Sequence, residues 1–269
     1  MGTHFKPGFT IIETMLVLAI TGVLIAGLLV GIGSSISNQR YGDAVSSFKA
    51  LLQDQYSRVS NVSNDRDADW TCAANATPVQ AGGGIASGQS DCVLLGRYVG
   101  VVNGDISMAT IVGYENSTAA GTNDITELKD NYTLGVSTSS VETTTLEWGA
   151  QIAWPKSGGG FRNPTTPRSL AIFILRSPNS GTTYTFTSDT VVDVADISSA
   201  TLKAMMVQTT ASYPGQGART ICVDPGGVGV PEILAVNISS GASAPGAIET
   251  RSNATAAALV ADGTEAPKC

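Results

Sequence analysis

Residues 8–33 of this chain read GFTIIETMLVLAITGVLIAGLLVGIG, a long and almost uninterrupted apolar stretch. The 25 residues from Phe9 to Gly33 contain one charged side chain, that of Glu13. As a helix rising about 1.5 Å per residue, they would measure roughly 37 Å, which exceeds the hydrocarbon core of a bilayer. The sequence therefore predicts a membrane-spanning helix at residues 9–33.

The short segment before this apolar run is MGTHFKPG, in which Lys6 is the clearest positive charge. A secretory signal peptide is cleaved after its apolar segment, but here the processing signal precedes it, so we expect the apolar run to be retained. Burying an unpaired carboxylate in hydrocarbon costs about 2.5 kcal/mol or more. Glu13 is therefore either solvated at the interface of a simple membrane anchor or paired with a partner.

The motif Gly8-Phe9-Thr10-Ile11-Ile12-Glu13, followed by an apolar run, resembles the processing and methylation motif of type IV prepilins. In that family a membrane peptidase cleaves after the glycine and methylates the new amine, and the glutamate pairs with the amine of a neighbouring subunit. The resemblance implies that residues 1–8 are a leader peptide and that the bond between Gly8 and Phe9 is cleaved. It also implies that Phe9 and Glu13 act in assembly.

The helix departs from many major pilins in having no proline between Pro7 and Pro78. In those pilins an internal proline loosens the helix on assembly. Glycine lowers helix propensity by about 1 kcal/mol relative to alanine, so glycines are the alternative positions at which the helix could loosen. They stand at Gly22, Gly27, Gly31 and Gly33.

Residues 34–60 are amphipathic and continue the same helix. Apolar side chains recur three or four residues apart and form one helical stripe, which we expect to pack against the rest of the protein. The stripe consists of Tyr41, Val45, Phe48, Leu52, Tyr56 and Val59. The polar segment SNVSNDRDAD at residues 60–69 should end the helix.

The remaining chain, residues 61–269, alternates apolar segments with Gly, Pro, Asn and Ser clusters and predicts a β-rich globular head. The fold class expected is α+β, with a long N-terminal helix packed on an antiparallel sheet, as in pilin heads. The strand candidates are residues 93–102, 106–114, 145–154, 170–175, 183–186, 191–194, 221–223 and 233–238.

The four cysteines form no CxxC pair and none lies beside a histidine, so disulfides outside the cytoplasm are favoured over zinc. Four cysteines allow three connectivities. Pilin heads close their C-terminal region with a disulfide, and Cys222 and Cys269 bracket such a region here. With that resemblance we expect Cys72 to pair with Cys92 and Cys222 with Cys269.

Composition excludes several classes of function. The net charge is −7, so we expect no specific nucleic-acid binding. His4 is the only histidine and lies in the expected leader, so the mature chain would have no imidazole for a catalytic base or metal. Gly82–Gly84 and Gly158–Gly160 lack the lysine of a phosphate-binding loop, and Asp65, Asp67 and Asp69 lack the rest of a calcium loop. We therefore expect no catalytic residues, no metal and no cofactor.

The function expected from the resemblance is that of a structural subunit of a type IV pilus, serving adhesion and possible twitching motility. Alternatives are a minor pilin, a pseudopilin of type II secretion or competence, and a filament-tip adhesin with a receptor site at Trp148, Trp154 and Tyr184. The expectation for these three aromatic side chains themselves is that they belong to the core. Its partners would be identical subunits, the prepilin peptidase, an inner-membrane assembly platform with cytoplasmic ATPases, and a host-cell or surface receptor. The precursor would reside in the inner membrane and the product in an extracellular pilus.

Overall fold

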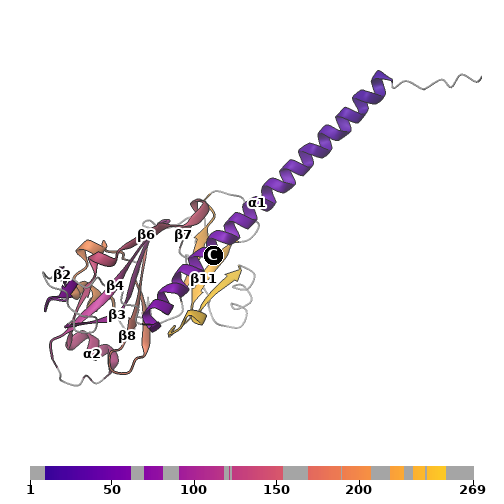
Figure 1. Ribbon diagram of the computed structural model, residues 1–269. Helices are drawn as coiled ribbons and strands as arrows, with labels where there is room; N and C mark the ends of the chain where they lie inside the picture. Colours follow the sequence, from indigo (N-terminus) through magenta and orange to yellow (C-terminus); the bar gives the residue numbers. More distant parts are fainter. Residues whose placement is uncertain are drawn as a thin grey trace, which may run out of the picture.

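The computed structural model describes residues 10–61, 70–80, 91–117, 121, 123–153, 169–188, 190–206, 219–226, 233–239 and 241–252. The protein is α+β, as expected: one long helix projects from a head built of antiparallel sheets (Figure 1). The expected leader, Gly8, Phe9 and Cys269 lie outside the described residues.

The long helix α1 runs without interruption from Ile11 to Asn61. Its first half is exposed, whereas its second half buries the whole predicted stripe, together with Ala44 and Gln55. The prediction of a single helix with an amphipathic second half is therefore confirmed for the described residues. Figure 1 shows this second half lying along the head, with the first half extending beyond it.

A six-stranded antiparallel sheet forms the larger part of the head. The strand order is β5-β4-β3-β8-β9, and β6 pairs with β4 beside β5. Asn103, at positive φ, helps to make the short turn between β3 and β4. The strands are β3 (Cys92–Val102), β4 (Asp105–Glu115), β5 (Tyr132–Val136), β6 (Glu142–Thr145), β8 (Ser169–Arg176) and β9 (Thr183–Ser188).

A second antiparallel sheet has the strand order β12-β11-β10-β7. Its strands are β7 (Gln151–Ala153), β10 (Arg219–Asp224), β11 (Leu234–Ile238) and β12 (Ile248–Ser252). A separate ribbon pairs β1 (Trp70–Cys72) with β2 (Pro78–Gln80). The helical segments of the head are α2 (Asp124–Asp130), α3 (Ser199–Met205), and the 3₁₀ turns η1 (Thr138–Ser140), η2 (Glu147–Gly149), η3 (Val194–Asp196) and η4 (Pro245–Ala247).

Two hydrophobic cores lie on opposite faces of the six-stranded sheet. The first joins α1 to both sheets, because Phe48 and Leu52 share one cluster with Val99 and Ile221. The second lies under α2 and α3, where the rings of Tyr98 and Phe173 are 5.2 Å apart. The second half of α1 is thus the common support of the two sheets.

A register shift in β3 places two residues that are three positions apart on the same face of the sheet. Side chains alternate between the faces of a strand, yet Leu95 and Tyr98, three residues apart, belong to the same core. The pairing of β3 with β4 shifts register between Leu94 and Gly96. The alternation of side chains between the two faces is therefore interrupted there, and Leu95 faces the same side as Tyr98. At Gly96 an added Cβ would lie 1.9 Å from the carbonyl oxygen of Ile174, so only glycine fits this site.

Six of the eight strand candidates correspond to β3, β4, β8, β9, β10 and β11. The prediction of a strand at residues 145–154 is wrong, because η2 interrupts it and Trp148 and Gly149 have positive φ. The strand predicted at residues 191–194 is also absent. There the backbone of Val192 binds the Tyr98 hydroxyl and the Asp193 carboxylate caps η3.

The expected disulfide between Cys72 and Cys92 is present, with a Cα–Cα distance of 5.7 Å. It ties the β1–β2 ribbon to the start of β3. Cys222 is also disulfide-bonded, but Cys269 lies outside the described residues, so that pairing stays a prediction.

Candidate functional site

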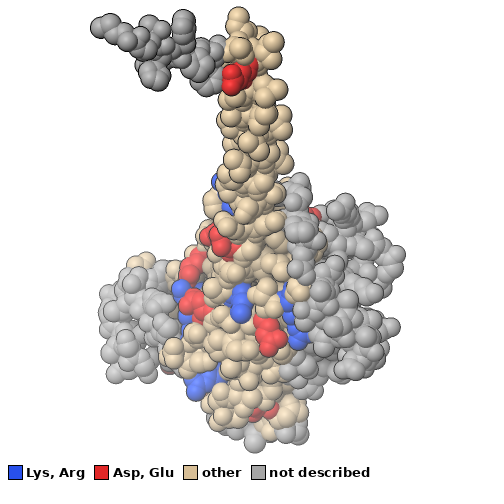
Figure 2. Space-filling model, turned by 90° about the vertical axis from the view of Figure 1, so that its right-hand side faces the viewer, with Lys and Arg blue, Asp and Glu red and all other residues tan. Residues whose placement is uncertain are grey.

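The exposed half of α1 is the largest apolar surface among the described residues, and we call residues 11–36 the apolar sleeve. Its large hydrophobic side chains are between 42% and 78% exposed, from Ile36 to Ile12. Figure 2 shows the sleeve free of charge between an acidic patch near its start and the charges at the head. Within the described residues, α1 alone has the length and composition to cross a membrane. Monomers seldom expose so much apolar surface unless lipid or protein covers it.

Glu13 lies at the start of the apolar sleeve and is exposed. Thr10 precedes the first helical residue, and its hydroxyl accepts from the backbone N–H of Glu13 at 3.3 Å. Thr10 and Glu13 thus hold the positions of a T-x-x-E capping box, in which the glutamate supports the helix start. A capping role of the Glu13 side chain must therefore be separated from any role in pairing between chains.

The sleeve glycines have no contact in the isolated chain that explains them. A Cβ added at Gly22, Gly27, Gly31 or Gly33 would find nothing within 4 Å. The helix is continuous through all four positions. Any function of these glycines therefore concerns neighbouring molecules or later conformational change, and not the fold of the single chain.

A polar network fastens α1 to the six-stranded sheet. Arg97, which is 4% exposed, donates to Gln55 at 2.8 Å, to Thr110 at 2.8 Å and to Glu142 at 3.1 Å. Glu142 also accepts from Arg58 at 2.7 Å. Burial lowers the pKa of the Arg97 guanidinium, while the Glu142 carboxylate opposes this shift.

Two tyrosines of α1 fasten it to other parts of the head. The Tyr41 hydroxyl donates to the Val223 carbonyl at 2.8 Å and accepts from the Leu234 backbone N–H at 2.7 Å. The Tyr56 hydroxyl bonds the Thr185 hydroxyl at 2.6 Å. With Arg97, these contacts hold the head rigidly on the helix that carries the sleeve.

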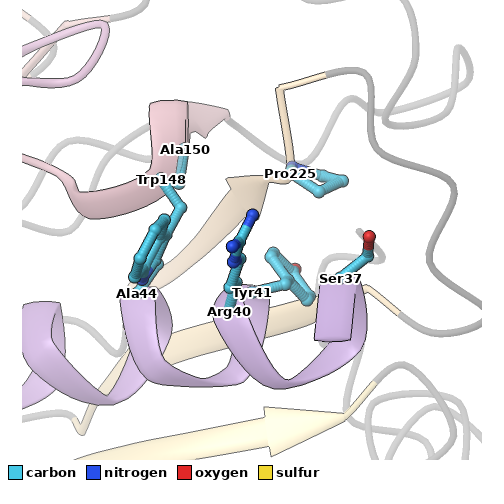
Figure 3. Close-up of a pocket in the computed structure, with 7 residues that line it drawn as sticks. All are labelled: Ser37, Arg40, Tyr41, Ala44, Trp148, Ala150 and Pro225. Atoms are coloured by element: carbon cyan, nitrogen blue, oxygen red, sulfur yellow. The ribbon is translucent and has the colours of Figure 1, made fainter. Parts of the chain in front are cut away.

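A small pocket opens where the sleeve enters the head, with a volume of about 100 Å³. Trp148 and Arg40 lie side by side in its lining, and the Arg40 guanidinium lies 4.7 Å from the centre of the indole ring (Figure 3). Trp148 is 56% exposed, so the expectation that it belongs to the core is wrong. The complete lining is Ser37, Arg40, Tyr41, Ala44, Trp148, Ala150 and Pro225.

The aromatic residues considered as a receptor site do not form one patch. Trp148 lies beside α1, whereas Tyr184 packs against the core on the other face of the six-stranded sheet and donates to Asp124. Trp154 lies outside the described residues. The structure therefore gives no common surface to Trp148 and Tyr184.

Other candidate groups are local to the fold or cannot be placed. No three His, Cys, Asp or Glu side chains converge within the part of the chain that the structure describes. Asp224 accepts from the Gly226 backbone N–H, as in a turn. The aspartates at 65, 67 and 69 and both triple-glycine segments fall outside the described residues.

Sequence reasoning located the sleeve and Glu13 and considered Trp148 only together with Trp154 and Tyr184, but it missed Arg40 and Arg97. Arg97 follows the same alternation as Val99 and Val101, and this signal could have placed it on the buried face of β3. The position of Trp148 had no such signal, because a left-handed tryptophan is rare and its neighbours suggested a strand.

Comparison with known proteins finds one family model. Residues 6–29 match the prokaryotic N-terminal methylation motif, and this range includes the expected cleavage site, Glu13 and most of the apolar run. No curated protein and no solved structure matches the chain.

Proposed function

Because this chain is a type IV prepilin-like protein, we propose that it is a structural subunit of a type IV pilus, assembled through its N-terminal helix. The observation that carries the proposal is the apolar sleeve, which stands clear of the head and has no covering segment among the described residues. In the membrane, lipid would cover it. In a filament, the sleeves of neighbouring subunits would take the place of lipid.

Cleavage between Gly8 and Phe9 would create a new amine four residues before Glu13. Both charges tolerate the membrane interface, where water remains available. Packing of helices removes that water, and pairing the Phe9 amine with the Glu13 carboxylate of a neighbouring subunit would then bury both groups together. This pairing would set the axial register of the subunits.

The rigid attachment of the head supports a role as a building block. Arg97, Tyr41 and Tyr56 fix the head relative to α1, so the position of the helix determines the position of the head. A filament built on helix packing would thus display every head in the same orientation. The prepilin peptidase and an inner-membrane assembly platform driven by cytoplasmic ATPases are the partners that this role requires.

The test replaces Glu13 in cells and counts surface filaments at matched levels of cleaved protein. Glu13→Ala should reduce filaments at least tenfold, because an unpaired buried amine costs about 3 to 5 kcal/mol. Glu13→Gln retains a side chain that serves a capping box but loses the charge, so it should also be impaired, though less. Asp43→Ala is the matched control, since it removes one exposed carboxylate from the same helix outside the sleeve.

The pattern of these variants separates the two roles of Glu13. Wild-type filament numbers for Glu13→Gln with loss for Glu13→Ala would assign Glu13 to helix capping alone. Normal filament numbers for both variants would show that Glu13 has no role in assembly.

A further inference from the structure

The junction of sleeve and head carries a cationic and aromatic pair that the fold does not explain. Arg40 is the first charged residue after Glu13 along the chain. Its guanidinium stacks on Trp148, which keeps more than half of its surface exposed. Trp148 has a φ of 58°, a conformation that non-glycine residues seldom adopt and that clusters at binding sites.

The position along α1 places this pair at the expected level of lipid headgroups. Arg40 follows Ile36, the last exposed large hydrophobic residue of the sleeve, by one helical turn, or about 6 Å. Side chains on a helix lean towards its N-terminus, so the Arg40 side chain leans towards the sleeve and the bilayer. Figure 1 shows α1 leaving the head at this end.

The length of the sleeve favours close approach of the head to the membrane. At about 1.5 Å per residue, residues 11–36 measure roughly 39 Å, against a hydrocarbon core of about 30 Å. A helix longer than the hydrocarbon tilts, and tilting towards η2 (Glu147–Gly149) lowers Trp148 into the headgroup layer. Tryptophan and arginine both suit that layer, because each joins an apolar body to a polar group.

We propose that Arg40 and Trp148 form a phospholipid-headgroup site that seats the head on the outer surface of the membrane before assembly. Arg40 binds the lipid phosphate, and Trp148 holds the guanidinium in place while its ring lies among the headgroups. The inference rests on the membrane anchorage contained in the proposed function and adds the contact that sets the height of the head.

Charge and size favour a lipid phosphate over other occupants. Within the part of the chain that the structure describes, Arg40 has no carboxylate partner, so its charge is available for an anion. The adjoining pocket has a volume of about 100 Å³, whereas pockets for drug-sized ligands measure about 300 to 1,000 Å³. The site is also continuous with the apolar sleeve that lipid would cover.

Fluorescence quenching in proteoliposomes tests the proposal with the full chain. The chain has three tryptophans, so Trp70→Phe combined with Trp154→Phe leaves Trp148 as the only emitter. Vesicles of phosphatidylcholine with phosphatidylglycerol would carry a nitroxide either on the headgroup or deep in the acyl chain. We expect the headgroup quencher to reduce Trp148 emission at least twofold and the deep quencher to have a smaller effect.

Two matched proteins calibrate this measurement. A protein that keeps Trp70 alone reports from the β1–β2 ribbon, at the end of the head away from the sleeve (Figure 1), and should not be quenched. Ile20→Trp in a chain without other tryptophans reports from the sleeve and should respond to the deep quencher. Arg40→Gln should weaken headgroup quenching of Trp148, and Arg40→Lys should restore part of it.

The controls separate failure of this inference from failure of the anchorage. If Ile20→Trp is quenched by the deep label but Trp148 is not quenched by the headgroup label, the head stands clear of lipid and the inference is wrong. It is equally wrong if Trp148 is shielded only in sheared filaments, because a neighbouring subunit would then be the occupant. If Ile20→Trp itself is not quenched, the chain is not inserted and the anchorage is refuted as well.

Discussion

At the scale of single residues, three buried tyrosines make the head sensitive to alkali. Burial raises the pKa of Tyr41, Tyr56 and Tyr98 to about 12, against an ordinary value of 10.0. Hydrogen bonds to the Leu234 and Val192 backbones and to the Thr185 side chain offset only part of this shift. Each tyrosine therefore prefers its neutral form more strongly in the folded protein than in the unfolded chain.

We expect the folded head to lose stability at high pH. Below pH 10 these tyrosines are neutral in both states, so their contribution to stability is fully present. As the pH rises from 10 towards 12, the unfolded chain releases protons that the folded chain retains, and each tyrosine lowers the free energy of unfolding by up to about 1.4 kcal/mol per pH unit. Urea unfolding of the detergent-solubilised protein between pH 8 and about 11.5 measures this loss.

Tyr98→Phe is the informative variant for this prediction, because Tyr98 packs in the second core and does not contact α1 through its hydroxyl. It should be less stable than the wild type at neutral pH and lose less stability between pH 10 and 12. A variant with an unchanged alkaline slope would exclude Tyr98 as a source of the pH dependence.

At the scale of elements, the attachment of α1 to the six-stranded sheet depends on Arg97. Arg97→Met keeps much of the volume but leaves Gln55 and Thr110 without their donor and Glu142 with Arg58 alone. We expect a loss of about 2 to 4 kcal/mol in the free energy of unfolding, since charged hydrogen bonds with a buried partner are lost.

The matched control for Arg97 is Arg251→Met on β12. Arg251 pairs with Glu249 at 3.5 Å, and the Glu249 side chain is 55% exposed, so this pair should contribute less than about 1 kcal/mol. Urea unfolding followed by near-ultraviolet circular dichroism compares the two variants. Equal losses would show that the Arg97 network does not stabilise the junction.

The elements also show what sequence patterns predict well. The stripe of α1 and the central strands β3, β4 and β8 were found because long apolar segments with a clear period bury most of their residues. Among the elements that were missed are β12, with sequence IETRS, and α2, with sequence DITELKD. The secondary structure of both depends more on contacts with neighbouring segments than on their own composition. β12 forms by pairing with β11, and α2 begins where the Asn123 side chain caps it.

At the scale of the whole molecule, the division into two sheets was beyond the reach of the sequence pattern. Strand periodicity indicates which side chains are buried but not which strands pair. The switch between sheets occurs at η2, where Trp148 and Gly149 turn the chain from β6 towards β7. The candidate site shares this limit: Glu13 and the apolar sleeve follow from the local sequence, whereas the Arg40–Trp148 contact joins residues more than 100 positions apart.

The whole molecule thus consists of a head fixed on a helix whose apolar half is exposed in the isolated chain. Lipid before assembly and neighbouring helices after it would supply that cover in turn. Assembly through Glu13 requires that the leader be removed, because only cleavage after Gly8 creates the amine with which Glu13 is expected to pair.

Intact-mass analysis of protein from sheared surface filaments would show whether the assembled subunits have lost the leader. We predict a chain of 261 residues that begins at Phe9 and carries one methyl group on its N-terminal amine. A terminal peptide fragment should place that methyl group on Phe9. Assembled filaments whose subunits retain Met1 would contradict the account.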